Sequence, residues 1–171
     1  LSLSEFKAGI PELPVTKTLP KPDGFNVDDY YILLPGASKG AKRWPLSNFV
    51  ELARRIYQAT GLTVLICGGP GEESLGKILE QDAGVPLQNW VGLTSLEELV
   101  AIIAGAHMLI GNDTGAVHIS TAVLTPAVCI LGGGHYGRFM PYRLEIETER
   151  PLPVTVVNKA DCFGCNWRCI H

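Results

Sequence analysis

The chain has 171 residues, of which 46% are hydrophobic and 18% charged, and its formal net charge is −3. A chain of this length buries roughly 70% of the surface of its unfolded state, which is enough for one ordinary hydrophobic core. Lysine and arginine are scattered, so the electrostatic footprint of a nucleic-acid-binding protein is missing. No apolar run approaches the roughly 20 residues of a transmembrane helix, and the N-terminus lacks the pattern of a signal peptide. We therefore expect one domain, located in the cytoplasm, that binds no nucleic acid.

The first 29 residues differ in composition from the rest of the chain. They contain prolines at positions 11, 14, 20 and 22, show little periodicity, and begin with a leucine. Segments of this kind are typical of linkers between domains. We expect residues 1–29 to be a linker from a missing N-terminal domain, residues 30–160 to form the globular domain, and residues 161–171 to be a cysteine-rich tail.

Patterns of apolar residues predict alternating strands and helices along the chain. Continuous apolar runs are typical of parallel strands buried on both faces, and they predict strands over 30–34, 62–67, 107–111 and 127–131. We also expect a brief strand at about 89–91 and a last strand at 154–157. Apolar residues at helical spacing predict helices from a cap at Ser47 to Gly61, over 72–83, after a capping box of Thr94 and Glu97, and from the turn at 111–115 to about Val123.

This alternation, joined by short glycine-rich turns, indicates right-handed βαβ units around a parallel sheet. The predicted fold class is therefore α/β, with a Rossmann-like parallel sheet flanked by helices. In open sheets of this kind, ligands bind beyond the carboxyl ends of the strands. Three turns meet that edge, at 35–45, 68–73 and 111–115.

The stretch Gly111-Asn112-Asp113-Thr114-Gly115-Ala116-Val117-His118 is a predicted strand-to-helix turn. Such a turn leaves the first backbone N–H groups of the helix unpaired, where an anionic group can accept hydrogen bonds from them. Gly111 and Gly115 remove side chains that would keep a ligand off this backbone. We therefore predict that the amides at 113–115 hold the phosphates of a nucleotide.

A phosphate site at this turn needs a cation, because a helix terminus contributes only about 0.3–2 kcal/mol whereas micromolar binding requires about 8 kcal/mol. Lys42, in the loop that leaves the first strand, is the first candidate, and Arg43 and Lys39 come next. The alternative is a solvated loop with ordinary surface lysines. Trp44 and Pro45, which would fix the end of the loop, favour the binding interpretation.

Three side chains of the turn have both structural and binding interpretations. Asp113 can cap the helix or accept a hydrogen bond from a sugar hydroxyl, and it can do both. Thr114 can lend its hydroxyl to a phosphate oxygen. His118 would return to the face of the turn, either as a structural residue or as a hydrogen-bonding group that the positive helix end keeps neutral.

Two acidic residues, Glu72 and Glu73, follow Gly68-Gly69-Pro70-Gly71 at the start of a helix. They can complement the helix dipole, or one of them can bind the ribose hydroxyls of a nucleotide, as acids do in other Rossmann-like folds. The glycine run fits neither the dinucleotide-binding pattern nor the P-loop pattern. A site for NAD or for a P-loop nucleotide is therefore poorly supported.

Four segments together resemble glycosyltransferase family 9, the heptosyltransferases, over about residues 30–135: PGA at 35–37, AKRWP at 41–45, GGPGEE at 68–73 and GNDTGAVH at 111–118. The resemblance implies one half of a GT-B fold, in which two Rossmann-like domains face each other and this one holds the nucleotide-sugar donor, ADP-heptose or similar. It implies donor-binding roles for Ser38, Lys42, Asp113, Thr114, Gly115 and His118, and for Glu72 or Glu73 at the ribose.

The resemblance also implies an inverting enzyme that adds heptose to the inner core of lipopolysaccharide and requires no cofactor or metal. The family's general base lies in an N-terminal domain, which would also bind the lipopolysaccharide-core or other glycan acceptor. We therefore expect no catalytic residue in this chain and no activity from the fragment alone. The implied location is the cytoplasm, with peripheral attachment to the inner membrane left open.

The chain departs from the family pattern after the strand at 127–131. Leu131-Gly132-Gly133-Gly134-His135-Tyr136-Gly137-Arg138-Phe139 stands where a phenylalanine-glycine turn is usual. Arg138 and His135 have two interpretations, a contact with the sugar or a neighbouring domain and a plain surface loop. The identities of the donor sugar and the acceptor stay open for this reason.

The cysteines fall into two groups. Cys67 and Cys129 lie in apolar strand-like runs, whereas Cys162, Cys165 and Cys169 crowd the C-terminal end. A CxxC pattern there is compatible with a zinc or iron–sulfur site. Reduced thiols packed against aromatic residues are the alternative, and we predict no metal site.

Two other functions are compatible with the same residues. The first is a non-catalytic nucleotide-binding or regulatory module, which would work without a catalytic partner domain. The second is a different nucleotide-sugar enzyme, such as an epimerase of related architecture. Binding measurements with several nucleoside diphosphates distinguish these from a heptosyltransferase domain.

Overall fold

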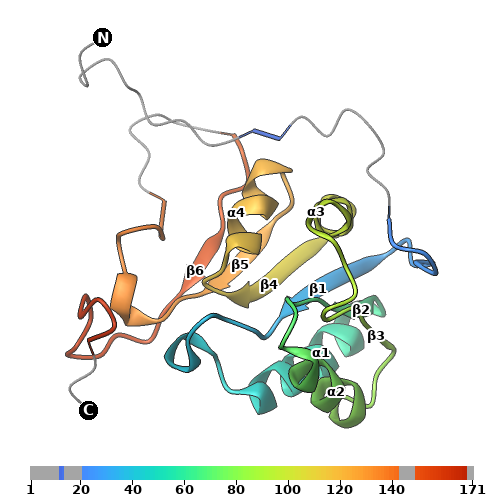
Figure 1. The fold of residues 1–171 in the computed structure, drawn as a ribbon, viewed down its shortest axis with the longest axis horizontal. Coiled ribbons are helices and arrows are strands. Elements are labelled where there is room, and N and C mark those ends of the chain that lie inside the picture. Colours follow the sequence, from blue (N-terminus) through green and yellow to red (C-terminus); the bar gives the residue numbers. More distant parts are fainter. Residues whose placement is uncertain (1–11, 14–20, 143–148, 169–171) are drawn as a thin grey trace.

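A computed structural model describes residues 12–13, 21–142 and 149–168 of the chain. The strands in this part are β1 Tyr30–Leu34, β2 Thr63–Ile66, β3 Leu87–Asn89, β4 Met108–Asn112, β5 Ala127–Ile130 and β6 Val154–Val156. They form one sheet in the order β3-β2-β1-β4-β5-β6, and all neighbouring strands are parallel (Figure 1). This order is that of the doubly wound Rossmann-like fold, so the predicted α/β fold class is confirmed.

Helices cover both faces of the sheet. In the described residues the α-helices are α1 Leu46–Thr60, α2 Glu73–Asp82, α3 Leu96–Ala104 and α4 Gly115–Ala122, and short 3-10 turns lie at Gly40–Lys42 and Gly133–His135. Figure 1 shows α1 and α2 together on one side of the sheet and α3 and α4 on the other. The connections through α1, α2 and α4 each cross one face between neighbouring parallel strands, and the loops that follow β1, β2 and β4 lie at the carboxyl edge of the sheet.

The central strand β1 is buried on both faces and connects two hydrophobic clusters. Tyr30 packs in the cluster that α3 and α4 cover, and Tyr31 packs in the cluster that α1 and α2 cover. The hydroxyl of Tyr30 donates to the carbonyl oxygen of Ile102 at 2.7 Å, and that of Tyr31 donates to the carbonyl oxygen of Ala53 at 3.1 Å. Buried phenols need such partners, and these two join the strand to a helix on each face.

Two cysteines belong to the same packed interior. Cys67 and Cys129 are fully buried, and burial raises the pKa of each thiol to about 12. Both therefore stay protonated at neutral pH and act as small apolar groups. Their predicted place in apolar strand-like runs is confirmed.

Several element ends differ from the predicted ones. β3 lies at Leu87–Asn89 rather than 89–91. The predicted cap at Ser47 is wrong, because α1 begins at Leu46 and Pro45 occupies the N-cap position without a side-chain hydrogen bond. The predicted stop at Gly61 is confirmed, since its φ of 71° is in the left-handed region that glycine adopts at helix ends.

The predicted capping box of α3 is wrong by one residue. Ser95 caps the helix: its hydroxyl accepts from the N–H of Glu98 at 3.2 Å, and the Glu98 carboxylate accepts from the N–H of Ser95 at 2.7 Å. The sequence pattern of a hydroxyl residue followed three positions later by an acid fits both Thr94–Glu97 and Ser95–Glu98. Only the position of the helix distinguishes the two.

Residues 21–29 precede β1 and pack partly on the sheet. The ring of Phe25 lies 5.4 Å from that of Tyr30 and 5.8 Å from that of Trp90, measured between centroids. Of residues 1–20, which belong to the predicted linker, 1–11 and 14–20 lie outside the described residues. Among the residues that the structure describes, no helix has the length and apolar character needed to cross a membrane.

A buried amide joins the loop after β1 to the end of β4. The side chain of Asn112 is fully buried. Its Oδ1 accepts from the backbone N–H of Trp44 at 3.0 Å, and its Nδ2 donates to the carbonyl oxygens of Pro35 and Gly36 at 2.8 and 3.3 Å. Asparagine is disfavoured in strands, and these bonds compensate for its burial. They hold both ends of the 35–45 loop against β4.

We expect Asn112→Ala to lower the free energy of unfolding by about 2–4 kcal/mol, because it leaves buried backbone groups of the loop without partners. Urea denaturation measures this loss. Asn158→Ala, at an exposed position, is the matched control and should change the free energy by less than about 0.5 kcal/mol. Equal midpoints for the Asn112→Ala variant and the unsubstituted protein would show that the loop does not depend on this amide.

Candidate functional site

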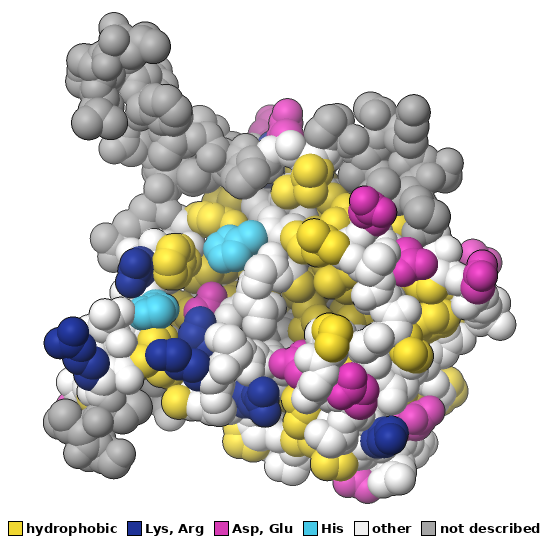
Figure 2. Space-filling model, viewed as in Figure 1, with side chains coloured by type: hydrophobic (Ala, Val, Ile, Leu, Met, Phe, Trp, Pro, Cys, Tyr) yellow, Lys and Arg dark blue, Asp and Glu magenta, His cyan; other side chains and the backbone are white. Residues whose placement is uncertain are grey.

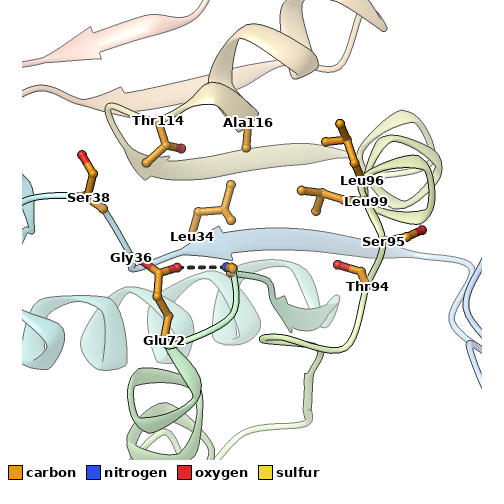
Figure 3. Close-up of a pocket in the computed structure, with 13 residues that line it drawn as sticks. Leu34, Gly36, Ser38, Glu72, Thr94, Ser95, Leu96, Leu99, Thr114 and Ala116 are labelled. Carbon is orange, nitrogen blue, oxygen red and sulfur yellow. Dashed lines mark hydrogen bonds between the residues drawn. The ribbon is translucent and has the colours of Figure 1, made fainter.

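Two adjoining pockets lie at the carboxyl ends of β1, β2 and β4. The larger pocket, of about 460 Å³, is lined by Ser38, Lys42, Asp113, Thr114, Gly115, His118 and Phe139. The smaller pocket, of about 250 Å³, is shown in Figure 3, and Ser38 and Thr114 line it as well. Among the predicted site residues, Glu72 lines the smaller pocket and Glu73 lines neither. The structure therefore brings all of them except Glu73 to one edge of the sheet.

The charged part of the larger pocket is an ion pair between Lys42 and Asp113. The Lys42 Nζ lies 2.9 Å from Asp113 Oδ2, and the side chains are only 13% and 7% exposed. The 3-10 turn at Gly40–Lys42 directs the lysine toward β4. Of the three predicted cations, Lys42 is the one at the turn, because Lys39 is exposed and Arg43 turns to the carbonyl oxygen of Ala37 at 3.0 Å.

The start of α4 differs from the predicted turn in two respects. Thr114, not Asp113, is the N-cap residue, and no side chain caps the helix. The N–H of Asp113 donates to the carbonyl oxygen of Ile130 at 3.2 Å, so this predicted phosphate donor is engaged at the edge of the sheet. The Thr114 Oγ1 is buried and has no hydrogen-bond partner among the described residues. The donors left for an anion are thus this hydroxyl and the first N–H groups of the helix.

The two glycines of the turn differ in what a side chain at their position would meet. A Cβ at Gly111 would come within 2.6 Å of the Cβ of Leu34, so this glycine is required by packing between β4 and β1 rather than by a ligand. A Cβ at Gly115 would meet no atom within 4 Å. Gly115 therefore faces open space in the larger pocket, where its backbone is accessible to a ligand.

His118 lies one turn into α4 and lines the larger pocket. Its Nδ1 is hydrogen-bonded to the hydroxyl of Tyr142, and the two rings meet edge to face with centroids 5.6 Å apart. Burial raises the pKa of Tyr142, so this phenol is protonated at neutral pH. A phenol hydroxyl can both donate and accept, so this hydrogen bond forms with either tautomer of the imidazole.

The two acidic residues at the start of α2 point in different directions. Glu72 Oε2 accepts from the N–H of Gly69 at 3.0 Å, and its carboxylate lies so close to Gly36 that a Cβ there would collide with it (Figure 3). Glu73 Oε1 accepts from the N–H of Gly71 at 3.0 Å, and this bond lowers the pKa of Glu73. Glu72 thus faces the smaller pocket, whereas Glu73 stabilises its own turn.

The sequence does not predict that the smaller pocket has an apolar wall. Leu34, Leu96, Leu99 and Ala116 lie along one side of this pocket, across from Glu72 (Figure 3). Helical spacing assigns Leu96 and Leu99 to the buried face of α3, yet Leu96 is 68% exposed. In the sequence, Leu96 is only an apolar residue at the first position of a helix. Such a residue is equally compatible with the wall of a pocket and with the hydrophobic core.

Basic and apolar side chains occupy different regions of the face shown in Figure 2. Figure 2 shows Lys and Arg side chains gathered beside two histidines, next to a region of hydrophobic side chains. Arg138 is exposed and its Nη1 donates to Asn166 Oδ1 at 3.5 Å, while the ring of His135 lies 5.8 Å from that of Trp167. Neither Arg138 nor His135 lines either pocket.

The C-terminal cysteines are only partly described. Cys162 and Cys165 have free thiols, while Cys169 lies outside the described residues. In the part of the chain that the structure describes, no three histidine, cysteine or acidic side chains gather as a metal site would require.

Comparison with known proteins connects this fold to one enzyme family. The chain is 34% identical over 103 residues to lipooligosaccharide heptosyltransferase 2 of Haemophilus influenzae, which covers 57% of the chain and 30% of that protein. A family 9 glycosyltransferase of Veillonella parvula has a similar structure, with a TM-score of 0.67, 21% identity, and coverage of 80% of this chain and 38% of that one.

A heptosyltransferase of Escherichia coli, solved with ADP-2-deoxy-2-fluoro heptose, is similar with a TM-score of 0.58 and 23% identity over 82% of this chain and 41% of that one. The chain spans less than half the length of each of these proteins. The sequence profile of glycosyltransferase family 9 (heptosyltransferase) matches residues 11–150, which is most of the chain. The chain therefore belongs to glycosyltransferase family 9, and its fold is the Rossmann-like α/β fold of these GT-B enzymes.

Proposed function

We propose that this chain is the nucleotide-sugar-binding domain of an inverting glycosyltransferase that adds heptose to the inner core of lipopolysaccharide. The observation that carries the proposal is the shared position of three groups in the larger pocket. They are the Lys42 ammonium, the unpaired Thr114 hydroxyl and the uncapped start of α4. The donor would be ADP-heptose or a similar nucleotide sugar.

The polar groups of the larger pocket suit a pyrophosphate. A lysine ammonium has three N–H donors, and Asp113 accepts from Lys42, so further donors are left for phosphate oxygens. The N-terminus of α4 adds backbone N–H groups and a positive partial charge. Ser38 and Thr114, which line both pockets, are in reach of a ligand that extends from one pocket to the other.

The smaller pocket suits the nucleoside. Its apolar wall of Leu34, Leu96 and Leu99 offers a surface for a flat base, and the Glu72 carboxylate on the opposite side offers an acceptor for ribose hydroxyls. The sugar would then lie in the larger pocket, where Asp113 and His118 present a carboxylate and an imidazole to its hydroxyl groups. The solved relative with an ADP-heptose analogue supports this class of donor.

The proposed chemistry is a direct displacement at the anomeric carbon of the donor. An acceptor hydroxyl forms the new bond to this carbon as the bond to the diphosphate oxygen breaks, and the electron pair of that bond goes to the departing diphosphate. Negative charge on the diphosphate grows in the transition state. Lys42 and the first N–H groups of α4 would stabilise it, because preorganised donors cost no reorganisation during the reaction.

The proposal assigns binding, not proton removal, to this chain. The general base and the acceptor site would belong to an N-terminal domain, and this chain alone would be inactive in transfer. No metal or other cofactor has a role in the proposed displacement. The whole enzyme would act in the cytoplasm, where its lipopolysaccharide-core acceptor is presented at the inner membrane.

Calorimetry with ADP, UDP and GDP tests the proposed function directly. We expect ADP to bind most tightly, with a dissociation constant in the micromolar range that corresponds to about 8 kcal/mol. A clear preference for UDP would point instead to another nucleotide-sugar enzyme. If the folded protein binds none of the three, the site is not a nucleotide site.

Lys42→Met should weaken ADP binding by about 10- to 100-fold, because a charge-assisted hydrogen bond contributes about 1.5–3 kcal/mol. Adenosine binding should stay unchanged, since the nucleoside pocket does not contain this lysine. Lys39→Met is the matched control, at an exposed lysine of the same loop, and should leave both affinities intact. Equal losses for ADP and adenosine would assign Lys42 to packing.

Glu72→Gln and Glu73→Gln form a pair that separates the two acids. We expect Glu72→Gln to weaken ADP and adenosine by the same factor of about 5 to 10, because it removes the charge from a hydrogen bond to the ribose. Glu73→Gln should leave both affinities unchanged. The same calorimetry measures them, and the opposite ranking would contradict the assignment of Glu72 to the ribose.

A further inference from the structure

The segment 161–168 contacts Lys42, a residue of the larger pocket, through one aromatic side chain. The ring centroid of Trp167 lies 5.6 Å from Lys42 Nζ, on a residue 125 positions away in sequence. This is within the distance at which an aromatic face attracts an ammonium. The Lys42 side chain therefore has two described neighbours for its charge, the Asp113 carboxylate and the indole of Trp167.

The loop after β5 is built to seat this ring. A Cβ at Gly132 would lie 2.5 Å from Trp167 Cη2, and a Cβ at Gly134 would lie 2.4 Å from Trp167 Cδ2. The N–H of Asn166 donates to the carbonyl oxygen of Gly134 at 2.9 Å. The absence of side chains in this loop, together with the backbone bond, fixes the position of the indole.

Phe163 has the same relation to the middle glycine of the loop. A Cβ at Gly133 would lie 2.4 Å from Phe163 Cδ2, and the N–H of Gly164 donates to the carbonyl oxygen of Gly133 at 2.9 Å. The Phe163 ring packs 5.3 Å from that of Tyr136. Phe163 thus helps to hold the segment, while Trp167 makes the aromatic contact with Lys42.

The backbone conformation of Trp167 and the burial of its indole N–H are both energetically unfavourable. Its φ is 60°, a left-handed conformation that a bulky residue rarely adopts. Its indole N–H is buried and has no hydrogen-bond partner among the described residues. Strain of this kind persists where the surroundings enforce it, and it concentrates at functional sites.

We propose that Trp167 is a positioning residue for the Lys42 ammonium, and therefore that the segment 161–168 is part of the phosphate-binding site. This inference rests on the proposed function. The indole covers one side of the ammonium, excludes water from it and limits the rotamers of the lysine side chain. An ammonium held in this way meets the diphosphate with less loss of conformational entropy and in a medium of lower dielectric constant.

Calorimetry with ADP and adenosine on two variants of the whole protein tests this role. Trp167→Phe keeps an aromatic face. Trp167→Leu removes the aromatic face but keeps an apolar side chain at this position. We expect Trp167→Phe to bind ADP within threefold of the unsubstituted protein and Trp167→Leu to bind it about tenfold more weakly. Adenosine should bind both variants as it binds the unsubstituted protein.

Phe163→Ala is the matched control for loosening of the segment. It removes a ring that packs on the same glycine loop, so a merely structural role of Trp167 would make Phe163→Ala and Trp167→Leu equal in ADP affinity. That result, or equal ADP affinities for the leucine and phenylalanine variants at position 167, would overturn the inference while leaving the proposed function standing. Failure of the unsubstituted protein to bind ADP, UDP or GDP would overturn both.

Discussion

The candidate site depends on the connection between the end of β4 and the loop after β1. Asn112 binds the backbone near both ends of this loop, and the next residue, Asp113, receives the ammonium of Lys42 from its middle. The last residue of β4 and the residue that follows it thus hold the loop: Asn112 binds the backbone of the loop, and Asp113 binds the charge of Lys42. Since β1 and β4 are neighbours in the sheet, the arrangement follows from the strand order.

The ion pair also determines which ligands the larger pocket suits. A buried ion without a partner costs several kcal/mol, so Lys42 and Asp113 compensate for each other's burial and hold each other in place. A pocket with an unpaired lysine would attract any anion. The balanced pair, beside the unpaired Thr114 hydroxyl, instead favours a ligand that brings both an anionic group and hydroxyl groups. A nucleotide sugar has this combination: its diphosphate would face the ammonium and its sugar hydroxyls the carboxylate.

Local patterns predict the fold well and the site less completely. Apolar patterns predict each strand to within two residues, and the signal is strongest in β1, β2 and β4, whose residues are mostly buried. It does not separate Glu72 from Glu73, which differ only in the direction of the side chain at a helix start. Nor does it predict that Gly111 serves packing, since a glycine looks the same in sequence whether a ligand or Leu34 approaches it. The contact of Trp167 with Lys42 is not predicted either, because it joins distant parts of the chain and local residue spacing carries no information about such contacts.

The two pockets share some walls and differ in others. The loop after β1 and the start of α4 line both of them, whereas the loop after β2 and the start of α3 line only the smaller pocket and Phe139 of the loop after β5 lines only the larger one. The glycine run of 132–134 lies in the same loop as Phe139, and its lack of side chains is explained by the rings of Phe163 and Trp167 that occupy the space. Under the proposed function, the residues that recognise the nucleoside and those that recognise the diphosphate-sugar would differ, apart from Ser38 and Thr114. A change in the loop after β5 would then alter the preferred sugar without altering the preferred base, which gives the departure of this loop from the family pattern a physical consequence.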